Sequence, residues 1–144
     1  MVAMNGVLKA TAVGLVAVAA SCGTALATGQ CSLNGSVSGG DFHAFASYQH
    51  RTTPKREIRI FEVEIEISRR AKVSAGDSVV VLIDGKKVGA LPLERDRNGD
   101  LEIDLKYNSL RTSGPNQFPE NFPKISNSQL SLKIGKVTLQ ICTL

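Results

Sequence analysis

The chain has little of what aromatic binding sites need, with no tryptophan and only two tyrosines among its 144 residues. Platforms on which sugars or single-stranded nucleic acids stack are therefore scarce. The basic residues are scattered and the formal net charge is only +4, which argues against nucleic acid as a partner. No segment shows the period of an amphipathic helix. These absences favour a small protein built from strands.

Long hydrophobic runs are also missing. The most apolar stretch, Ala10 to Ala20, is shorter than the roughly 20 residues that a membrane-spanning helix requires. It follows Lys9 and precedes Ala25-Leu26-Ala27, small residues of the kind that a signal peptidase recognises. We therefore expect residues 1–27 to be a signal peptide. The mature chain, residues 28–144, should have no transmembrane segment and should be exported to the periplasm or the cell exterior.

Cysteine is sparse, with three residues in the chain. Cys22 follows small residues, as a lipid-modified cysteine does in bacterial lipoproteins, although Ala19 stands where that motif usually has leucine. A lipid anchor at Cys22 is therefore the alternative to its removal with the signal peptide. Cys31 and Cys142 bracket the mature chain, and in an oxidising compartment we expect a disulfide between them. Closing so long a loop is worth roughly 4 to 5 kcal/mol in the chain-entropy picture.

The segments that are present alternate with a period of two, which is the period of a half-buried strand. In "EIRIFEVEIEIS" (57–68) the apolar residues change phase between Ile60 and Phe61. Both halves of one strand cannot then face one core, so we expect a β-bulge or a change of sheet near these two residues. Further strands are expected within 31–49, 77–94, 101–106 and 129–144, separated by glycine and asparagine turns. Pro92 should lie at an edge or a bulge because it lacks an amide donor.

This pattern predicts an all-β fold, a single antiparallel β-sandwich, with a small closed β-barrel as the alternative. One segment, residues 108–128, has no alternation and forms a proline-rich loop of unusual length. Within it lie the tandem pairs Phe118-Pro119 and Phe122-Pro123. Two interpretations stay open. The phenylalanine rings either fill the end of the sandwich or form a partner-binding loop.

The stretch "ERDRNGDLEID" (94–104) places oxygen-bearing side chains at alternate positions, which suggests a metal site at Asp96, Asn98 and Asp100. The spacing of an EF-hand is not met, because Gly99 stands fourth and Leu101 sixth when the count begins at Asp96. Asn-Gly between alternating strands is instead a strong hairpin signal. We therefore expect a reverse turn here, and we assign no metal or cofactor to the chain.

The stretch from Val79 to Leu105, "VVVLIDGKKVGALPLERDRNGDLEIDL", resembles a β-hairpin module of uncharacterised exported bacterial β-sandwich proteins. The resemblance rests on turn glycines and apolar alternation over about a quarter of the mature chain. It implies an exported β-domain and carries no activity.

Two rows of carboxylates accompany the alternation: Glu62, Glu64 and Glu66 on one strand, and Asp100, Glu102 and Asp104 on another. If the strands were neighbours the rows would repel, which favours a bound cation or an intervening basic strand. Lys86, Lys87, Arg69 and Arg70 could supply the basic strand. The alternative is that both rows simply face water.

Catalytic residues are few. A hydrolase could be assembled from Asp41, His43 and Ser47, and a metal site from Asp41, His43 and His50, but nothing in the sequence supplies a nucleophile turn or an oxyanion site. We therefore expect no enzyme. The expected function is an exported binding or structural module with an unknown protein or surface partner, and the alternative is a calcium-binding domain that uses its acidic strand faces.

Overall fold

A computed structural model describes residues 25–144, and the side chains from residue 28 onward. This part of the chain contains nine strands and no helix. Their bounds are β1 Ala25–Val37, β2 Gly40–Thr52, β3 Glu57–Ile67, β4 Ser78–Ile83, β5 Lys86–Pro92, β6 Glu94–Arg95, β7 Leu101–Asn108, β8 Gln129–Ile134 and β9 Val137–Thr143.

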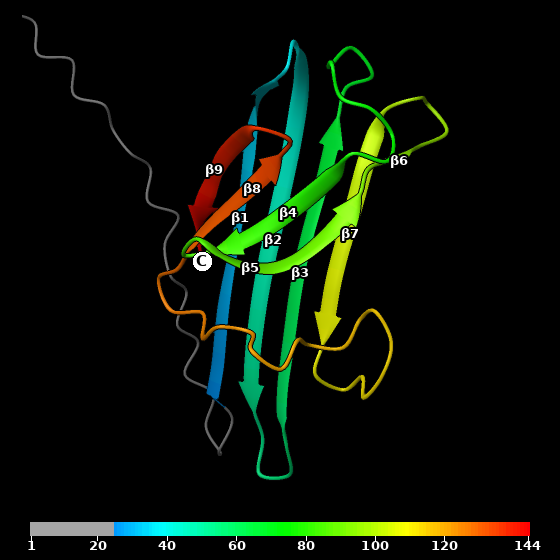
Figure 1. The fold of residues 1–144 in the computed structure, drawn as a ribbon. Helices are drawn as coiled ribbons and strands as arrows, with labels where there is room; N and C mark the ends of the chain where they lie inside the picture. The colour runs from blue at the N-terminus through cyan, green and yellow to red at the C-terminus, as the bar shows by residue number, and fades with distance from the viewer. Residues whose placement is uncertain (1–24) are drawn as a thin grey trace, which may run out of the picture.

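The strands form two antiparallel sheets, one of five strands in the order β1-β2-β3-β7-β6 and one of four in the order β5-β4-β8-β9. The shorter sheet lies across one face of the longer one (Figure 1). The prediction of an antiparallel β-sandwich is confirmed. The closed barrel is wrong, because the two sheets remain separate.

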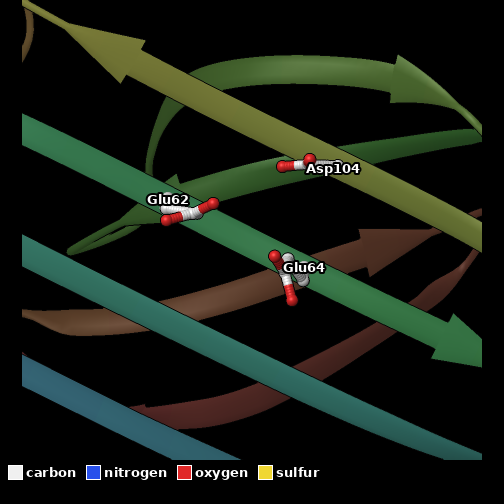
Figure 2. Close-up of side chains that lie close together, drawn as sticks. All are labelled: Glu62, Glu64 and Asp104. Atoms are coloured by element: carbon white, nitrogen blue, oxygen red, sulfur yellow. The ribbon is translucent and has the colours of Figure 1, made fainter.

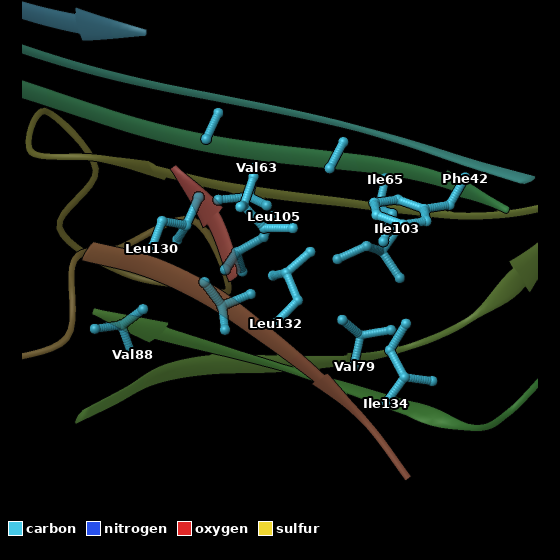
Figure 3. Packing of buried hydrophobic residues seen from close by; sticks show 14 of the residues in the cluster. Phe42, Val63, Ile65, Val79, Val88, Ile103, Leu105, Leu130, Leu132 and Ile134 are labelled. Atoms are coloured by element: carbon cyan, nitrogen blue, oxygen red, sulfur yellow. The ribbon is translucent and has the colours of Figure 1, made fainter. Parts of the chain in front are cut away.

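The core lies between the sheets and follows from the alternation of the sequence. On β3 the odd residues Val63, Ile65 and Ile67 point inward, and on β7 Leu101, Ile103 and Leu105 do the same. Across the gap they meet the apolar residues of the four-stranded sheet, among them Val79, Leu130, Leu132 and Ile134 (Figure 3). Burial of this apolar surface is the main stabilising term of the fold.

The β-bulge or change of sheet expected near Ile60 and Phe61 is wrong, because the whole of β3 lies in one sheet. β3 pairs with β2 and β7 without a register shift, and Ile58 and Ile60 lie half-buried on the outer face. The phase changes because β1, β2 and β3 extend past the end of the shorter sheet (Figure 1). Beyond that overlap the inner face of β3 meets the β7–β8 loop, where Arg59 covers the ring of Phe118, and no facing strand imposes an alternation.

Register shifts occur instead on two edge strands. On β5, Gly89 pairs with Val81 and Lys87 pairs with the next residue of β4, so Val88 between them is an extra residue. On β9 the extra residue is Ile141. The shift on β9 allows Leu139 and Cys142, three residues apart, to lie opposite Leu132 and Leu130, both of them core residues. Cys142 thereby faces the five-stranded sheet.

Cys31 and Cys142 form a disulfide that joins β1 of one sheet to β9 of the other, with 6.2 Å between their Cα atoms. The predicted pairing is therefore confirmed. The bridge ties the first described strand to the last, at the margin of the sandwich where β1 lies beside β9.

At the opposite margin of the sandwich, a buried hydroxyl group links the two sheets. Tyr107 Oη donates a hydrogen bond of 2.8 Å to the carbonyl oxygen of Val88 in the β5 bulge. Gly89 permits this approach, because a Cβ at that position would collide with the hydroxyl. Burial raises the pKa of Tyr107 above its ordinary value of 10.0. Tyr107 therefore links β7 to the other sheet.

The turn predictions hold in part. Asp84 and Gly85 both have positive φ, as a two-residue hairpin requires, and β5, which carries Pro92, is an edge strand as expected. The Asn98-Gly99 turn also forms a hairpin. Only Gly99 has positive φ there, so the turn is not of the mirror-image type with two such residues.

None of the described residues forms a helix long and apolar enough to cross a membrane. Cys22 and nearly all of the predicted signal peptide, residues 1–27, lie outside the described residues. The expected cleavage after Ala27 falls within β1, where residues 25–27 pair with residues 50–52 of β2.

Candidate functional site

The outer face of the five-stranded sheet, which the other sheet does not cover, carries a concentration of carboxylates. We call it the acidic face. Its members lie on β3, β6 and β7 and are Glu62, Glu64, Glu66, Glu94, Glu102 and Asp104. They are the outward half of the same alternation that builds the core. All except Glu62 are exposed.

Register places these carboxylates directly opposite one another. Glu64 is the cross-strand partner of Asp104, and Glu66 is the partner of Glu102. Glu102 is in turn paired with Glu94 on the short strand β6. Like charges at directly opposite positions of a sheet destabilise it. Three neighbouring strands thus present one row of three acidic residues without an intervening base.

The intervening basic strand considered from the sequence is wrong, because β3 and β7 are direct neighbours. Lys106 of β7 does lie on this face, with its Nζ 3.2 Å from Glu62 Oε1. The other proposed bases lie elsewhere. Lys86 Nζ donates to the carbonyl of Asn121, and the Arg69 guanidinium donates to the carbonyl of Asn98 at the β6–β7 turn.

The geometry allows several carboxylates to reach one point. One oxygen each from Glu62, Glu64 and Asp104 lies within 4.8 Å of the other two. Figure 2 shows these three side chains on the outward side of β3 and β7, with the other sheet behind them. Oxygens at this spacing can converge on one hard cation.

A cavity of about 470 Å³ opens on the same face. Five carboxylate residues line it, namely Glu64, Glu66, Glu94, Glu102 and Asp104, and Leu91 and Pro92 form an apolar wall. His43 completes the lining and lies opposite Glu66 on β2. Its Nδ1 is 2.6 Å from Asn34 Oδ1, so a hydrogen bond to β1 holds the ring in place.

The three metal candidates at the turn are Asp96, Asn98 and Asp100. They take part in hydrogen bonds that stabilise the hairpin. Asp96 Oδ1 accepts hydrogen bonds from the backbone N–H groups of Asn98 and Asp100, at 2.8 and 2.9 Å. Asp100 Oδ1 accepts the backbone N–H of Arg69 at 2.9 Å. One oxygen each of Asp96 and Asp100 also lies within 4.8 Å of one oxygen of Glu66. The turn therefore adjoins the acidic face, and its primary hydrogen bonds are structural.

Asp41 and His43 of the hydrolase hypothesis line one hollow, but Ser47 does not meet them. His43 and Ser47 lie on the same outward side of β2 but pair with Glu66 and Glu62 respectively, with Phe45 between them. Four residues of strand span roughly 13 Å, which is too far for proton transfer. The two histidines are also apart, because His50 Nε2 lies 2.6 Å from Glu57 Oε1 near the other end of β2.

The loop between β7 and β8 packs its phenylalanines inward. Phe118 is buried, and Phe122 is half-buried with its ring centroid 5.1 Å from that of Phe61 and 4.9 Å from that of Phe118. The guanidinium of Arg59 covers the Phe118 ring at 4.7 Å. Pro119 and Pro123 are also half-buried. Of the two interpretations left open by the sequence, this packing favours the one in which the rings fill the end of the sandwich.

Sequence inspection missed Glu94 as a member of the site, and it named His43 only for a hydrolase or a histidine metal site. Neither belongs to a charged row of its own strand, and only strand order brings them to the cavity. The alternation within one strand gives the outward residues, but no local signal states which strand lies next to it.

No protein-family model, no curated protein and no solved structure matches this chain. The resemblance to an exported hairpin module therefore stays a prediction.

Proposed function

We propose that this protein is an exported binding module that binds cations, with calcium as the ligand, on the acidic face of the five-stranded sheet. The observation that carries the proposal is the direct cross-strand pairing of Glu64 with Asp104 and of Glu66 with Glu102. Calcium takes six to eight oxygen ligands and tolerates irregular geometry, which suits carboxylates on an exposed surface.

Charge segregation supports a cationic ligand. The chain as a whole has a formal net charge of +4, yet the cavity on this face is lined by five acidic residues and by no lysine or arginine. A cleft lined by one sign of charge concentrates ions of the opposite sign. The repulsion among these groups weakens the free domain and is relieved when a cation binds, so the ligand should also stabilise the fold.

Affinity should be modest, because exposed carboxylates hold the cation without a closed cage. Extracellular calcium modules have dissociation constants on the order of 10⁻⁴ to 10⁻³ M, and we expect this range. The disulfide between Cys31 and Cys142 fits the same oxidising surroundings.

The test is calorimetric titration of the purified protein with calcium chloride, accompanied by thermal unfolding with and without the ion. We expect saturable heat and a melting temperature that rises with calcium concentration. Sodium chloride at matched ionic strength separates site binding from general screening, because screening acts equally for both salts.

Glu64→Gln should weaken calcium binding by about tenfold, on the order of 1.4 kcal/mol, and should leave the calcium-free protein folded. The matched control is Glu120→Gln, which removes an equally exposed carboxylate from the β7–β8 loop and should leave the affinity unchanged. Equal titrations in calcium and sodium, or equal losses in both variants, would refute the proposal.

A further inference from the structure

The two sheets have four edges, and three of them are protected against pairing with another strand. β5 carries Lys86, Lys87, Pro92 and a bulge. β9 has only seven residues and carries a bulge. β6 has only two residues, both charged. Charge, proline, bulges and shortness are the devices by which native edge strands avoid association.

The fourth edge, β1, has none of these devices. It runs for 13 residues, contains no charged residue and no proline, and pairs with β2 in an unbroken register. Among residues 25–144 no strand pairs with its other side. An edge of this length and regularity is a template for strand addition.

The free hydrogen-bonding groups of β1 belong to its even-numbered residues. The N–H of Ser68 donates to the carbonyl of Asp41 at 2.8 Å, so odd residues of β2 face β3 and even residues face β1. By the alternation of an antiparallel ladder, odd residues of β1 then bond to β2 and even residues point outward. The outward residues with described side chains are Thr28, Gln30, Ser32, Asn34 and Ser36, all exposed.

The sequence of β1 places residues of the same kind at equal distances on either side of Ser32. Around Ser32, "TGQCSLNGS" (28–36) reads similarly in both directions. Two such strands placed antiparallel about Ser32 set Thr28 opposite Ser36, Gln30 opposite Asn34 and Gly29 opposite Gly35. Each outward pair can hydrogen-bond through its side chains. Because the strand has no charge, a second copy meets no like-charge repulsion.

We propose that β1 pairs antiparallel with β1 of a second copy of this chain, with Ser32 on the two-fold axis, to form a dimer with a continuous ten-stranded sheet. The even residues provide the hydrogen-bonded pairs of this new ladder. A two-fold contact of one surface with itself closes after two subunits. The edge is then covered, and the acidic faces of the two copies lie on a common sheet.

The test uses protein expressed from the full-length sequence and recovered after export, studied by sedimentation velocity from micromolar to millimolar concentration. We expect a monomer–dimer equilibrium for the wild type. Ser32→Lys and Ser32→Glu place two like charges directly opposite each other in the dimer. Each substitution should therefore lower the dimerisation affinity by about fivefold or more. An equimolar mixture of the two should form a heterodimer at least as readily as the wild type.

Gln49→Lys is the matched control, because it adds the same charge to an exposed outward position of the inner strand β2 and should leave dimerisation unchanged. Circular dichroism and thermal unfolding check that each variant is folded, and the two charge variants check each other. A wild type that stays monomeric, or that instead takes up a strand from a different protein, would overturn the proposal. So would charge variants that dimerise normally, or a mixture that does not recover.

Discussion

The two faces of the β3–β7 strand pair share one backbone register, but one face carries apolar side chains and the other carries mostly acidic ones. On the inner face Val63 lies opposite Leu105 and Ile65 opposite Ile103, apolar pairs that the other sheet covers. On the outer face Glu64 lies opposite Asp104 and Glu66 opposite Glu102. The inner pairs stabilise the sandwich by burial, whereas the outer pairs work against it. The inner face therefore stabilises the fold, and the outer face presents negative charge to the solvent.

The largest expected effect comes from the inner face. Ile65 is 2% exposed, and Ile65→Ala removes buried methylene groups and leaves a cavity. Such changes cost about 2 to 5 kcal/mol. Urea unfolding followed by circular dichroism, with the disulfide kept intact, should show this loss as a lower midpoint with an unchanged slope.

The neighbouring outward residue provides the contrast. Glu64→Ala changes the same strand one position away and should alter the free energy of unfolding by no more than about 0.5 kcal/mol. Similar losses at both positions would mean that the outer face is also part of the stabilising core.

A smaller effect is expected from the one buried hydroxyl that joins β7 to the bulge of β5. Tyr107→Phe removes the hydrogen bond to the Val88 carbonyl and should cost about 1 kcal/mol. Burial raises the pKa of Tyr107, so folding favours the neutral phenol. Stability from this group is therefore complete below pH 10.0 and is lost as pH rises through the higher folded-state pKa.

Unfolding measured on both sides of pH 10 checks this sign. Wild type should lose more stability on the alkaline side than Tyr107→Phe does, because the variant has no phenol to ionise there. Burial also raises the pKa of Tyr48, while the charge of Arg59 lowers this pKa and that of Glu57 raises it. Tyr48 is present in both proteins, so its ionisation does not distinguish them. Parallel pH profiles would show that the Tyr107 hydroxyl is not responsible.

Much of the fold could be predicted from the sequence because alternation and turn residues are local signals. They predicted the strands, the outward position of Glu64 and the hairpins at Gly85 and Gly99. The disulfide between Cys31 and Cys142 was predicted from the expected oxidising compartment and from the count of cysteines. These features need no knowledge of which strands are neighbours.

What failed depends on neighbours and overlap. The phase change at Ile60 and Phe61 suggested a bulge or a change of sheet, but β3 keeps one register in one sheet and extends past the facing sheet. Direct pairing of Glu66 with Glu102 and the arrival of Glu94 beside it depend on strand order, which alternation does not contain. The candidate site was therefore only half predicted, as two separate rows of acids.

The smallest expected effect tests the outer face itself, in protein free of divalent cations. Glu66→Gln removes one charge from a like-charged pair and should raise the free energy of unfolding by about 0.2 to 1 kcal/mol at low ionic strength. Glu62→Gln removes the carboxylate that pairs with Lys106 at 3.2 Å and should lower it by about 0 to 1 kcal/mol. Both changes should shrink as salt screens the charges. Because the two substitutions are chemically identical and lie on one face of one strand, opposite signs identify the local pairing as the cause. Equal signs would mean that the register does not govern the energetics of the acidic face.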